Sequence, residues 1–276
     1  MTIDLDAYLR RIGYDGPVRA DADTLRALVA AHVRAVPFEN LDPLRGVPVA
    51  DLGPEALQDK LVARGRGGYC YEQNGLMGYV LERLGFGVER LAARVVWLRD
   101  PDGPEPAQTH LVLAVTIPGD DARRLVDVGF GGPTPPVPLV LGTAAEQPTT
   151  HEPYRLIDGD GVRALQAQIR AEWRTLYLFE ELPRPHVDLE VGSWYVSTHP
   201  ASKFVSQLVA ARVAPDGRYA LRGRNLAIHR GGATERVRFD TAAQVIEALT
   251  GTFGIDVSDV ADRAELERRV DEVLDA

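Results

Sequence analysis

The residue best suited to covalent chemistry is Cys70, the only cysteine in a chain of 276 residues. It follows a glycine pair within Arg64-Gly-Arg-Gly-Gly-Tyr-Cys-Tyr-Glu-Gln-Asn74, and it precedes a segment whose apolar residues have helical spacing. A cysteine at the start of a helix lies near free backbone N–H groups and the positive end of the helix dipole, which favour the nucleophilic thiolate. The alternative is a small, buried hydrophobic residue, and Cys70 alone does not separate the two interpretations.

A nucleophilic cysteine needs a base, and the base needs an acceptor that orients it. His110 suits the first role, because it begins an apolar predicted strand directly after a polar loop that ends at Thr109. Asp127 lies in an apolar run, where a carboxylate is costly unless it has a partner. If the two strands are antiparallel neighbours joined through residues 119–121, Asp127 can lie beside His110. The alternative interpretation of Asp127 is that its carboxylate pairs with a buried arginine or accepts a hydrogen bond from the N–H group of a turn.

The elements that must position these residues change type after residue 86. Before this point apolar residues recur at helical spacing, and caps, glycines and prolines mark the ends of helices. After it, short apolar runs alternate with turns rich in Pro, Gly and Asp, which is typical of strands. Helices are predicted at residues 4–11, 24–36, from Pro54, from Cys70 to Gly85, at 241–249 and at 263–274, and strands at 88–97, 110–117, 124–128, 164–169, 173–179, 219–221, 226–229 and 237–239.

This order of elements predicts an α+β protein in three parts. A helical bundle at residues 1–86 carries Cys70, a central antiparallel sheet or barrel at residues 87–195 carries His110 and Asp127, and a mixed α/β part follows at residues 196–276. The helix after Cys70 contains two glycines, each of which costs about 1 kcal/mol against alanine in a helix interior. We therefore expect another backbone to pack closely against Gly75 and Gly78.

Composition argues against several classes of function. The formal net charge of −9 disfavours nucleic acid or an anionic membrane as the main partner. A single cysteine excludes an intramolecular disulfide, no signal-peptide pattern is visible, and the apolar run at residues 111–117 is too short to cross a bilayer. We therefore expect a cytoplasmic protein. The sequence has no HExxH motif and no tight cluster of His and Asp, so no metal site is expected.

The chain resembles a known family, the arylamine N-acetyltransferases of bacterial type. The resemblance extends over about the first 210 residues in order, and its most specific part is the RGGYCxExN pattern around Cys70. The blocks that carry it are Val36-Pro-Phe-Glu-Asn-Leu41, Arg64 to Asn74, Leu81-Glu-Arg-Leu-Gly-Phe86, Thr109-His-Leu111, Val126-Asp-Val-Gly-Phe-Gly-Gly132 and Ser202-Lys-Phe204.

The resemblance implies a catalytic triad of Cys70, His110 and Asp127 in a cysteine-peptidase-like arrangement. The implied fold is a helical bundle, a β-barrel and an α/β lid. The implied reaction is a ping-pong transfer, in which Cys70 takes the acetyl group of acetyl-CoA and passes it to an arylamine or arylhydrazine without a metal. A role in xenobiotic metabolism would accompany this activity.

The resemblance also implies the residues that bind the two substrates. The expected walls of the aromatic slot are Phe38, Phe130 and Phe204, with Tyr71, Val95, Trp97 and Thr109 near the acyl position. The residues expected at CoA are Phe204 and His229, with Arg222, Arg224 and Arg230 as further candidates for its phosphates. Glu39 and Arg64 are expected to form a structural ion pair behind the site.

Three other functions are compatible with the same residues. An amide (macrolactam) synthase would use the same triad with a carrier-bound acyl chain, and a wider acyl slot would distinguish it. A hydrolase of cysteine-peptidase type would discharge the acyl group at a rate independent of arylamine. A binding module that retains only the fold would leave Cys70 unacylated and slow to react with iodoacetamide.

Overall fold

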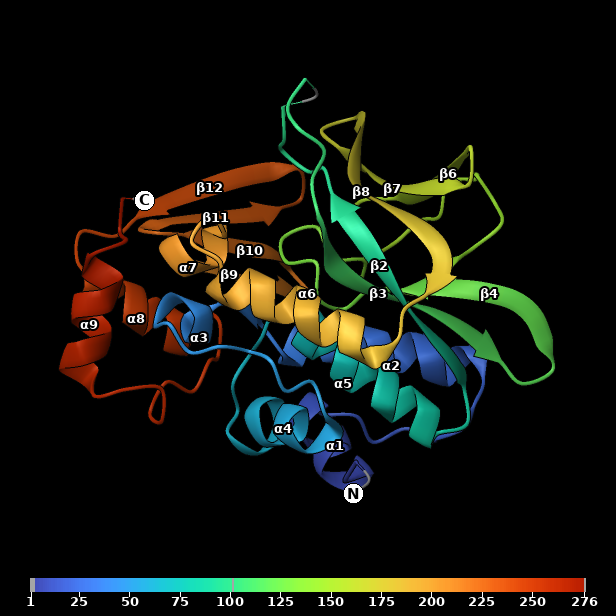
Figure 1. Ribbon diagram of the computed structural model, residues 1–276, viewed down its shortest axis with the longest axis horizontal. Helices are drawn as coiled ribbons and strands as arrows, with labels where there is room; N and C mark the ends of the chain where they lie inside the picture. The colour runs from blue at the N-terminus through green and yellow to red at the C-terminus, as the bar shows by residue number, and fades with distance from the viewer. Residues whose placement is uncertain (1–2, 101, 276) are drawn as a thin grey trace.

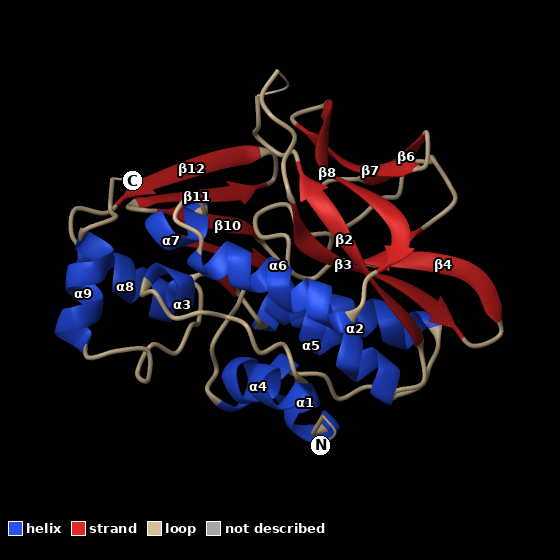
Figure 2. Ribbon diagram, in the orientation of Figure 1, coloured by secondary structure: helices blue, strands red, loops and turns tan. Residues whose placement is uncertain are grey.

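The computed structural model describes residues 3–100 and 102–275 and has the predicted α+β architecture. N-terminal helices lie against a curved seven-stranded sheet, and a five-stranded sheet with the C-terminal helices lies beside them (Figure 1). Figure 2 shows the same division by element type. The seven-stranded sheet is nearly closed into a barrel.

Local sequence signals set the ends of the N-terminal helices. Asp4 and Asp21 cap the first two helices, each accepting a backbone N–H group three residues further on. Gly13 closes the first helix in the left-handed conformation, with φ of 65°. The helices are α1 (Leu5–Ile12), α2 (Ala22–Ala35), α3 (Leu41–Leu44), α4 (Pro54–Gln58), a π-helical turn (Asp59–Ala63) and α5 (Cys70–Arg83).

The barrel sheet is antiparallel throughout, in the order β5-β4-β3-β2-β8-β7-β6. Strand β3 is buried on both faces, because alternate residues enter the helical core and the barrel core. This explains why its sequence is a continuous apolar run. The strands are β2 (Gly87–Val95), β3 (Gln108–Ile117), β4 (Asp120–Val126), β5 (Leu139–Val140), β6 (Tyr154–Gly159), β7 (Val162–Ile169) and β8 (Glu172–Pro183).

The five-stranded sheet, in the order β1-β9-β10-β11-β12, joins the N-terminal and C-terminal parts of the chain. One face packs against α8 and α9 through an apolar cluster. The strands are β1 (Phe38–Glu39), β9 (Val209–Ala214), β10 (Gly217–Arg222), β11 (Asn225–Arg230) and β12 (Ala233–Arg238). The remaining helices are α6 (His186–Thr198), α7 (Lys203–Ser206), α8 (Ala242–Gly251) and α9 (Arg263–Asp271).

Two features of the helices differ from the sequence prediction. Helix α6 was not predicted, because its valines and Gly192 have low helix propensity. A Cβ atom at Gly192 would lie 2.3 Å from the Tyr71 hydroxyl, so α6 can cover this ring only with glycine there. The sequence analysis expected another backbone to pack closely against Gly75 and Gly78 of α5. This expectation is wrong, since the side chains of Leu57 and Arg90 approach the two glycines instead.

None of the helices in the described part of the chain combines the length and apolar character that a bilayer crossing requires.

Candidate active site

The candidate nucleophile, Cys70, is the first residue of α5. The Glu72 carboxylate accepts the backbone N–H of Tyr69 at 3.0 Å, which fixes the first turn of the helix. Cys70 is only 4% exposed and belongs to the helical core, as a packed cysteine would. Its polar neighbours therefore have to decide whether Cys70 is a nucleophile or a packed hydrophobic residue.

His110 lies between Cys70 and Asp127. Its Nε2 atom is 2.7 Å from Oδ2 of Asp127, and its ring also makes a hydrogen bond with the Cys70 side chain. Because Nε2 is committed to Asp127, Nδ1 is the ring atom left for Cys70. The Sγ atom of Cys70 is also 3.7 Å from the carbonyl oxygen of Thr109. The three side chains thus have the order sulfur, imidazole and carboxylate that nucleophilic catalysis by cysteine requires.

Charge, rather than burial, decides the protonation of His110. Burial alone would lower the pKa of this imidazole, but the negative charges of Asp127 and Cys70, with their hydrogen bonds, raise the pKa to about 10. The ring is therefore protonated at neutral pH.

As the sequence predicted, β4 is the antiparallel neighbour of β3, but Asp127 directly follows β4 instead of lying within it. Its Oδ1 atom accepts hydrogen bonds from Nδ2 of Asn74 at 2.9 Å and from the N–H of Gly129 at 3.0 Å. Burial would raise the pKa of this carboxyl, but the charge of His110 and these hydrogen bonds lower it on balance. Since Asn74 lies one helical turn after Cys70, it connects the nucleophile helix directly to the carboxylate.

Several predicted substrate residues gather around His110 on the barrel side. The ring of Phe130 lies 5.3 Å from the imidazole, centroid to centroid, in an edge-to-face arrangement. Val95 pairs with Tyr177 across β2 and β8, and Tyr177 lies 5.0 Å from the imidazole. Trp97 packs on the same barrel core as Phe130.

Other predicted residues form a second aromatic group, contributed by β1, α5 and α7. The ring of Phe204, on α7, lies 5.8 Å from Phe38 and 5.6 Å from Tyr69. Tyr71 meets Tyr69 edge to face at 6.2 Å and donates its hydroxyl to the Gln108 carbonyl at 3.4 Å. Since Tyr69 and Tyr71 flank Cys70 in the sequence, this group lies beside the start of α5.

Tyr177 is a candidate functional residue that the sequence analysis missed. It is fully buried on β8, and its hydroxyl has no hydrogen bond of acceptable geometry within the described residues. Burial, and then the charge of Asp127, raises the pKa of Tyr177 well above its ordinary value. No signal in the local sequence could have identified it, because it belongs to an ordinary apolar strand.

His229, expected at CoA, lies on β11 of the five-stranded sheet and accepts or donates a hydrogen bond with Thr234 at 2.9 Å. Partial burial, and then the positive charges of Arg170 and Arg236, lowers the pKa of His229. Arg170, which belongs to the barrel, therefore lies close enough to lower the pKa of His229, which belongs to the lid.

The expected ion pair between Glu39 and Arg64 is wrong. Arg64 pairs with Asp59 and Asp259, each at 3.0 Å, and its side chain is 40% exposed. The partner of Glu39 is Arg66, with Nη2 2.7 Å from Oε1. Arg66 turns inward because its segment runs beside β1. The N–H of Glu39 donates there to the carbonyl oxygen of Gly68, two residues after Arg66.

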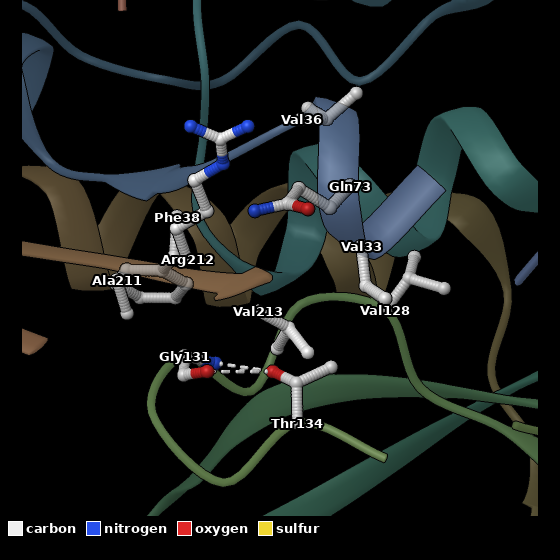
Figure 3. A pocket seen from close by; sticks show the side chains of 10 residues that line it. All are labelled: Val33, Val36, Phe38, Gln73, Val128, Gly131, Thr134, Ala211, Arg212 and Val213. Carbon is white, nitrogen blue, oxygen red and sulfur yellow. Dashed lines mark hydrogen bonds between the residues drawn. The ribbon is translucent and has the colours of Figure 1, made fainter. Parts of the chain in front are cut away.

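A small cavity lies behind the loop that follows Asp127. Figure 3 shows its walls, which come from α2, β1, α5, β9 and this loop, with Gln73, Gly131 and Thr134 among the lining residues. No group of three or more His, Cys, Asp or Glu side chains arranged to hold a metal ion occurs within residues 3–100 and 102–275.

Comparison with known proteins assigns the family. A family model described as N-acetyltransferase matches residues 21–262. An arylamine N-acetyltransferase of Mycolicibacterium smegmatis is 62% identical over 275 residues, which cover 100% of both chains. The chain belongs to the arylamine N-acetyltransferase family.

Solved structures of arylamine N-acetyltransferases superpose closely on the chain. The M. smegmatis enzyme gives a TM-score of 0.97 at 61% identity, with 100% of both chains covered. The Mycobacterium marinum enzyme in complex with CoA gives a TM-score of 0.96 at 60% identity, covering 98% of this chain and 99% of the other. The α+β fold described above is therefore the fold of this family.

Proposed function

We propose that this protein transfers the acetyl group of acetyl-CoA to the amino group of arylamines and arylhydrazines through an acetyl-Cys70 intermediate. The observation that carries the proposal is the buried contact of Cys70 with His110, whose Nε2 is 2.7 Å from Asp127. Family membership supports this reaction class, and the relative from M. marinum has been crystallised with CoA.

The first half of the reaction forms the acetyl enzyme. The sulfur of Cys70, paired with the imidazolium of His110, attacks the thioester carbon of acetyl-CoA. The bond from the acetyl carbon to the CoA sulfur then breaks, and His110 gives its proton to the departing sulfur. Asp127 holds the ring in place and balances its positive charge while it is protonated.

The second half returns the enzyme to its starting state. An arylamine attacks the acetyl carbon on Cys70, and neutral His110 accepts the proton that the amine loses. The carbon–sulfur bond breaks, and the Cys70 sulfur leaves beside the imidazolium. Backbone N–H groups in the first turn of α5 have no partners within the helix, and we assign them the oxyanion in both halves.

The two aromatic groups suit a flat amine substrate. Phe130 on the barrel side and the pair Phe38 and Phe204 on the other side can enclose an aryl ring near the acetyl carbon. The proposed pocket for the acetyl group is completed by Tyr71, Val95, Trp97 and Thr109. Stacking and edge-to-face contacts of this kind favour aromatic over aliphatic amines.

The CoA phosphates are assigned to the lid face that carries His229. The positive charges of Arg170, Arg236 and Arg218 all reach this imidazole, so the surface there attracts anions. Two of the arginines suggested by the sequence are engaged elsewhere. Arg224 bonds the side chain of Asp275, and Arg230 pairs with Asp216.

The proposal is tested by mass spectrometry of the intact protein after a brief reaction with acetyl-CoA. Wild-type protein is expected to gain the mass of one acetyl group and to lose it when an arylamine or hydrazine is added. Cys70→Ser should gain none, because His110 cannot hold a serine hydroxyl as an anion at neutral pH. An equal adduct in Cys70→Ser, or discharge at the same rate without amine, would contradict the proposal.

A further inference from the structure

We propose that Arg218 is a positioning residue for acetyl transfer: its guanidinium ties lid strand β10 to the loop after Asp127 and so holds Phe130 against His110. The catalytic part of this inference rests on the function proposed above. Arg218 touches neither the sulfur nor the imidazole, so it would act through the loop of residues 128–134.

Arg218 lies at the junction of the lid, the barrel and this loop. Its Nη1 atom donates to the carbonyl oxygens of Gly132 and Thr134, both at 2.9 Å. Its Nε donates to Oε2 of Glu152 at 2.9 Å, and its Nη2 donates to the Tyr154 hydroxyl at 2.9 Å. The Tyr154 hydroxyl in turn lies 2.5 Å from Oε1 of Glu152 and 3.0 Å from the carbonyl oxygen of residue 133. One side chain of the lid therefore holds the loop directly and through a neighbour.

This junction is buried, so its hydrogen bonds cannot be replaced easily by water. The side chain of Arg218 is 7% exposed and that of Glu152 is 13% exposed. A buried guanidinium whose donors are matched to a carboxylate and to carbonyl oxygens fixes the position of each partner. Removing it leaves carbonyl oxygens and a carboxylate without their donors, which favours rearrangement of the loop.

The loop that Arg218 holds is part of the proposed active site. Its Gly129 N–H donates to Asp127, and a Cβ atom at Gly129 would lie 2.8 Å from the Cα atom of Cys70. Phe130 meets the His110 ring at 5.3 Å. A small displacement of the loop therefore changes the surroundings of all three triad residues.

The loop also borders a small cavity. The cavity in Figure 3 lies directly behind Gly131 and Thr134, whose mutual hydrogen bonds are drawn there as dashed lines. Those bonds lie within the loop and do not fix it to the lid. Without Arg218, the loop would lose its direct hydrogen bonds to the lid, and Phe130 would no longer be held against His110.

Arg218 also connects this loop to the proposed CoA face. It pairs with His229 across β10 and β11, and paired residues on neighbouring strands point to the same side of a sheet. Tyr219 and Leu221 point the other way and pack in the cluster with α8 and α9. The same side chain therefore aligns the CoA half of the site with the triad half.

The test compares Arg218→Met with Arg268→Met, an arginine on α9 whose side chain is 68% exposed and which is assigned to neither substrate. In Arg218→Met, the rate constant of Cys70 acetylation, measured per titratable thiol, is expected to fall roughly ten- to a hundredfold, because small misplacements in an active site have effects of this size. The KM for acetyl-CoA should rise as well. Arg268→Met should leave both values unchanged, and Arg218→Lys should restore part of the loss.

A purely structural role would lower only the fraction of active protein, so unchanged values per titratable thiol in Arg218→Met would overturn the inference. If Arg218→Met does not fold, Tyr154→Phe removes one link of the junction and is expected to show the same direction of change. Hydrogen exchange at residues 129–134 gives a readout that does not depend on acetyl transfer. Faster exchange in Arg218→Met than in Arg268→Met supports the clamp even if Cys70 is never acetylated, and equal exchange contradicts it.

Discussion

At the level of single residues, the proton on His110 links the charge of Asp127 to the chemistry proposed at Cys70. The pKa of His110 is raised to about 10, although burial acts in the opposite direction, because two negative neighbours favour the charged ring. The imidazolium is thus present throughout the neutral range. It can supply a proton to the CoA sulfur at every pH below this value.

Replacing Asp127 by asparagine tests this link. Asp127→Asn keeps the shape of the side chain but removes the charge that raises the pKa of His110, so that pKa should fall by about 1–3 units. In single-turnover acetylation followed from neutral to strongly alkaline pH, the alkaline decline is expected near pH 10 for wild type. In Asp127→Asn it should begin at lower pH, whereas Asp121→Asn, at an exposed position of β4, should behave as wild type. An unmoved decline in Asp127→Asn would contradict the assignment.

Sequence reasoning identified the residues whose chemistry is unusual in their context, and the structure brings Cys70, His110 and Asp127 together. It missed Tyr177, because the contact of this ring with His110 depends on the pairing of β2 with β8 across a long separation in sequence. It also chose Arg64 instead of Arg66 as the inward arginine. Two arginines separated by one glycine carry no local signal of which one is buried.

At the level of elements, the start of α5 rests on a buried cluster of charges. Lys60 contacts Asp42 and Glu72, and Arg66 contacts Asp42 and Glu39. With three carboxylates and two cations, the cluster has one negative charge more than it has positive charges. Burial therefore raises the pKa of Glu72 even though Lys60 partly offsets it. For Lys60, burial acts to lower the pKa, but the surrounding carboxylates raise it on balance.

Breaking this cluster should destabilise the fold. Lys60→Met leaves the buried Glu72 carboxylate without its cation, and such losses cost about 3–5 kcal/mol of unfolding free energy. Chemical denaturation would measure the loss, with the exposed Lys203→Met as the matched control that should change little. Adding Glu72→Gln to Lys60→Met should recover part of the stability, since the unpaired charge is then gone. A Lys60→Met protein as stable as Lys203→Met would refute this account of α5.

The elements themselves were predictable where one periodicity dominates. The helices α2 and α5 and the strands β3, β7 and β8 lie where apolar spacing placed them, with their ends shifted by a few residues. Helix α6 was not predictable, because its valines and glycine favour other structures and only packing over Tyr71 makes it helical. The strand β9 was missed because its short Val/Ala sequence is compatible with several structures.

At the level of the whole molecule, the proposed triad exists only where separate layers meet. Cys70 comes from the helices, while His110 lies on β3 of the barrel and Asp127 directly follows the neighbouring strand β4. The order of helices and strands predicted the α+β class, but not that β1 would pair with β9 and bind the first part of the chain to the lid. Such a pairing leaves no local trace in sequence. The division at residues 86 and 195 stays a prediction.

The raised pKa of His110 is a sensitive measure of this assembly, because it requires the sulfur and the carboxylate to be in place on both sides of the ring. Nitrogen-15 NMR of the histidine side chains during a pH titration would measure it directly, with His110→Gln identifying the signal. The expected result is an imidazolium at neutral pH that loses its proton near pH 10. Titration near 6.5, the ordinary value for histidine, would contradict the account.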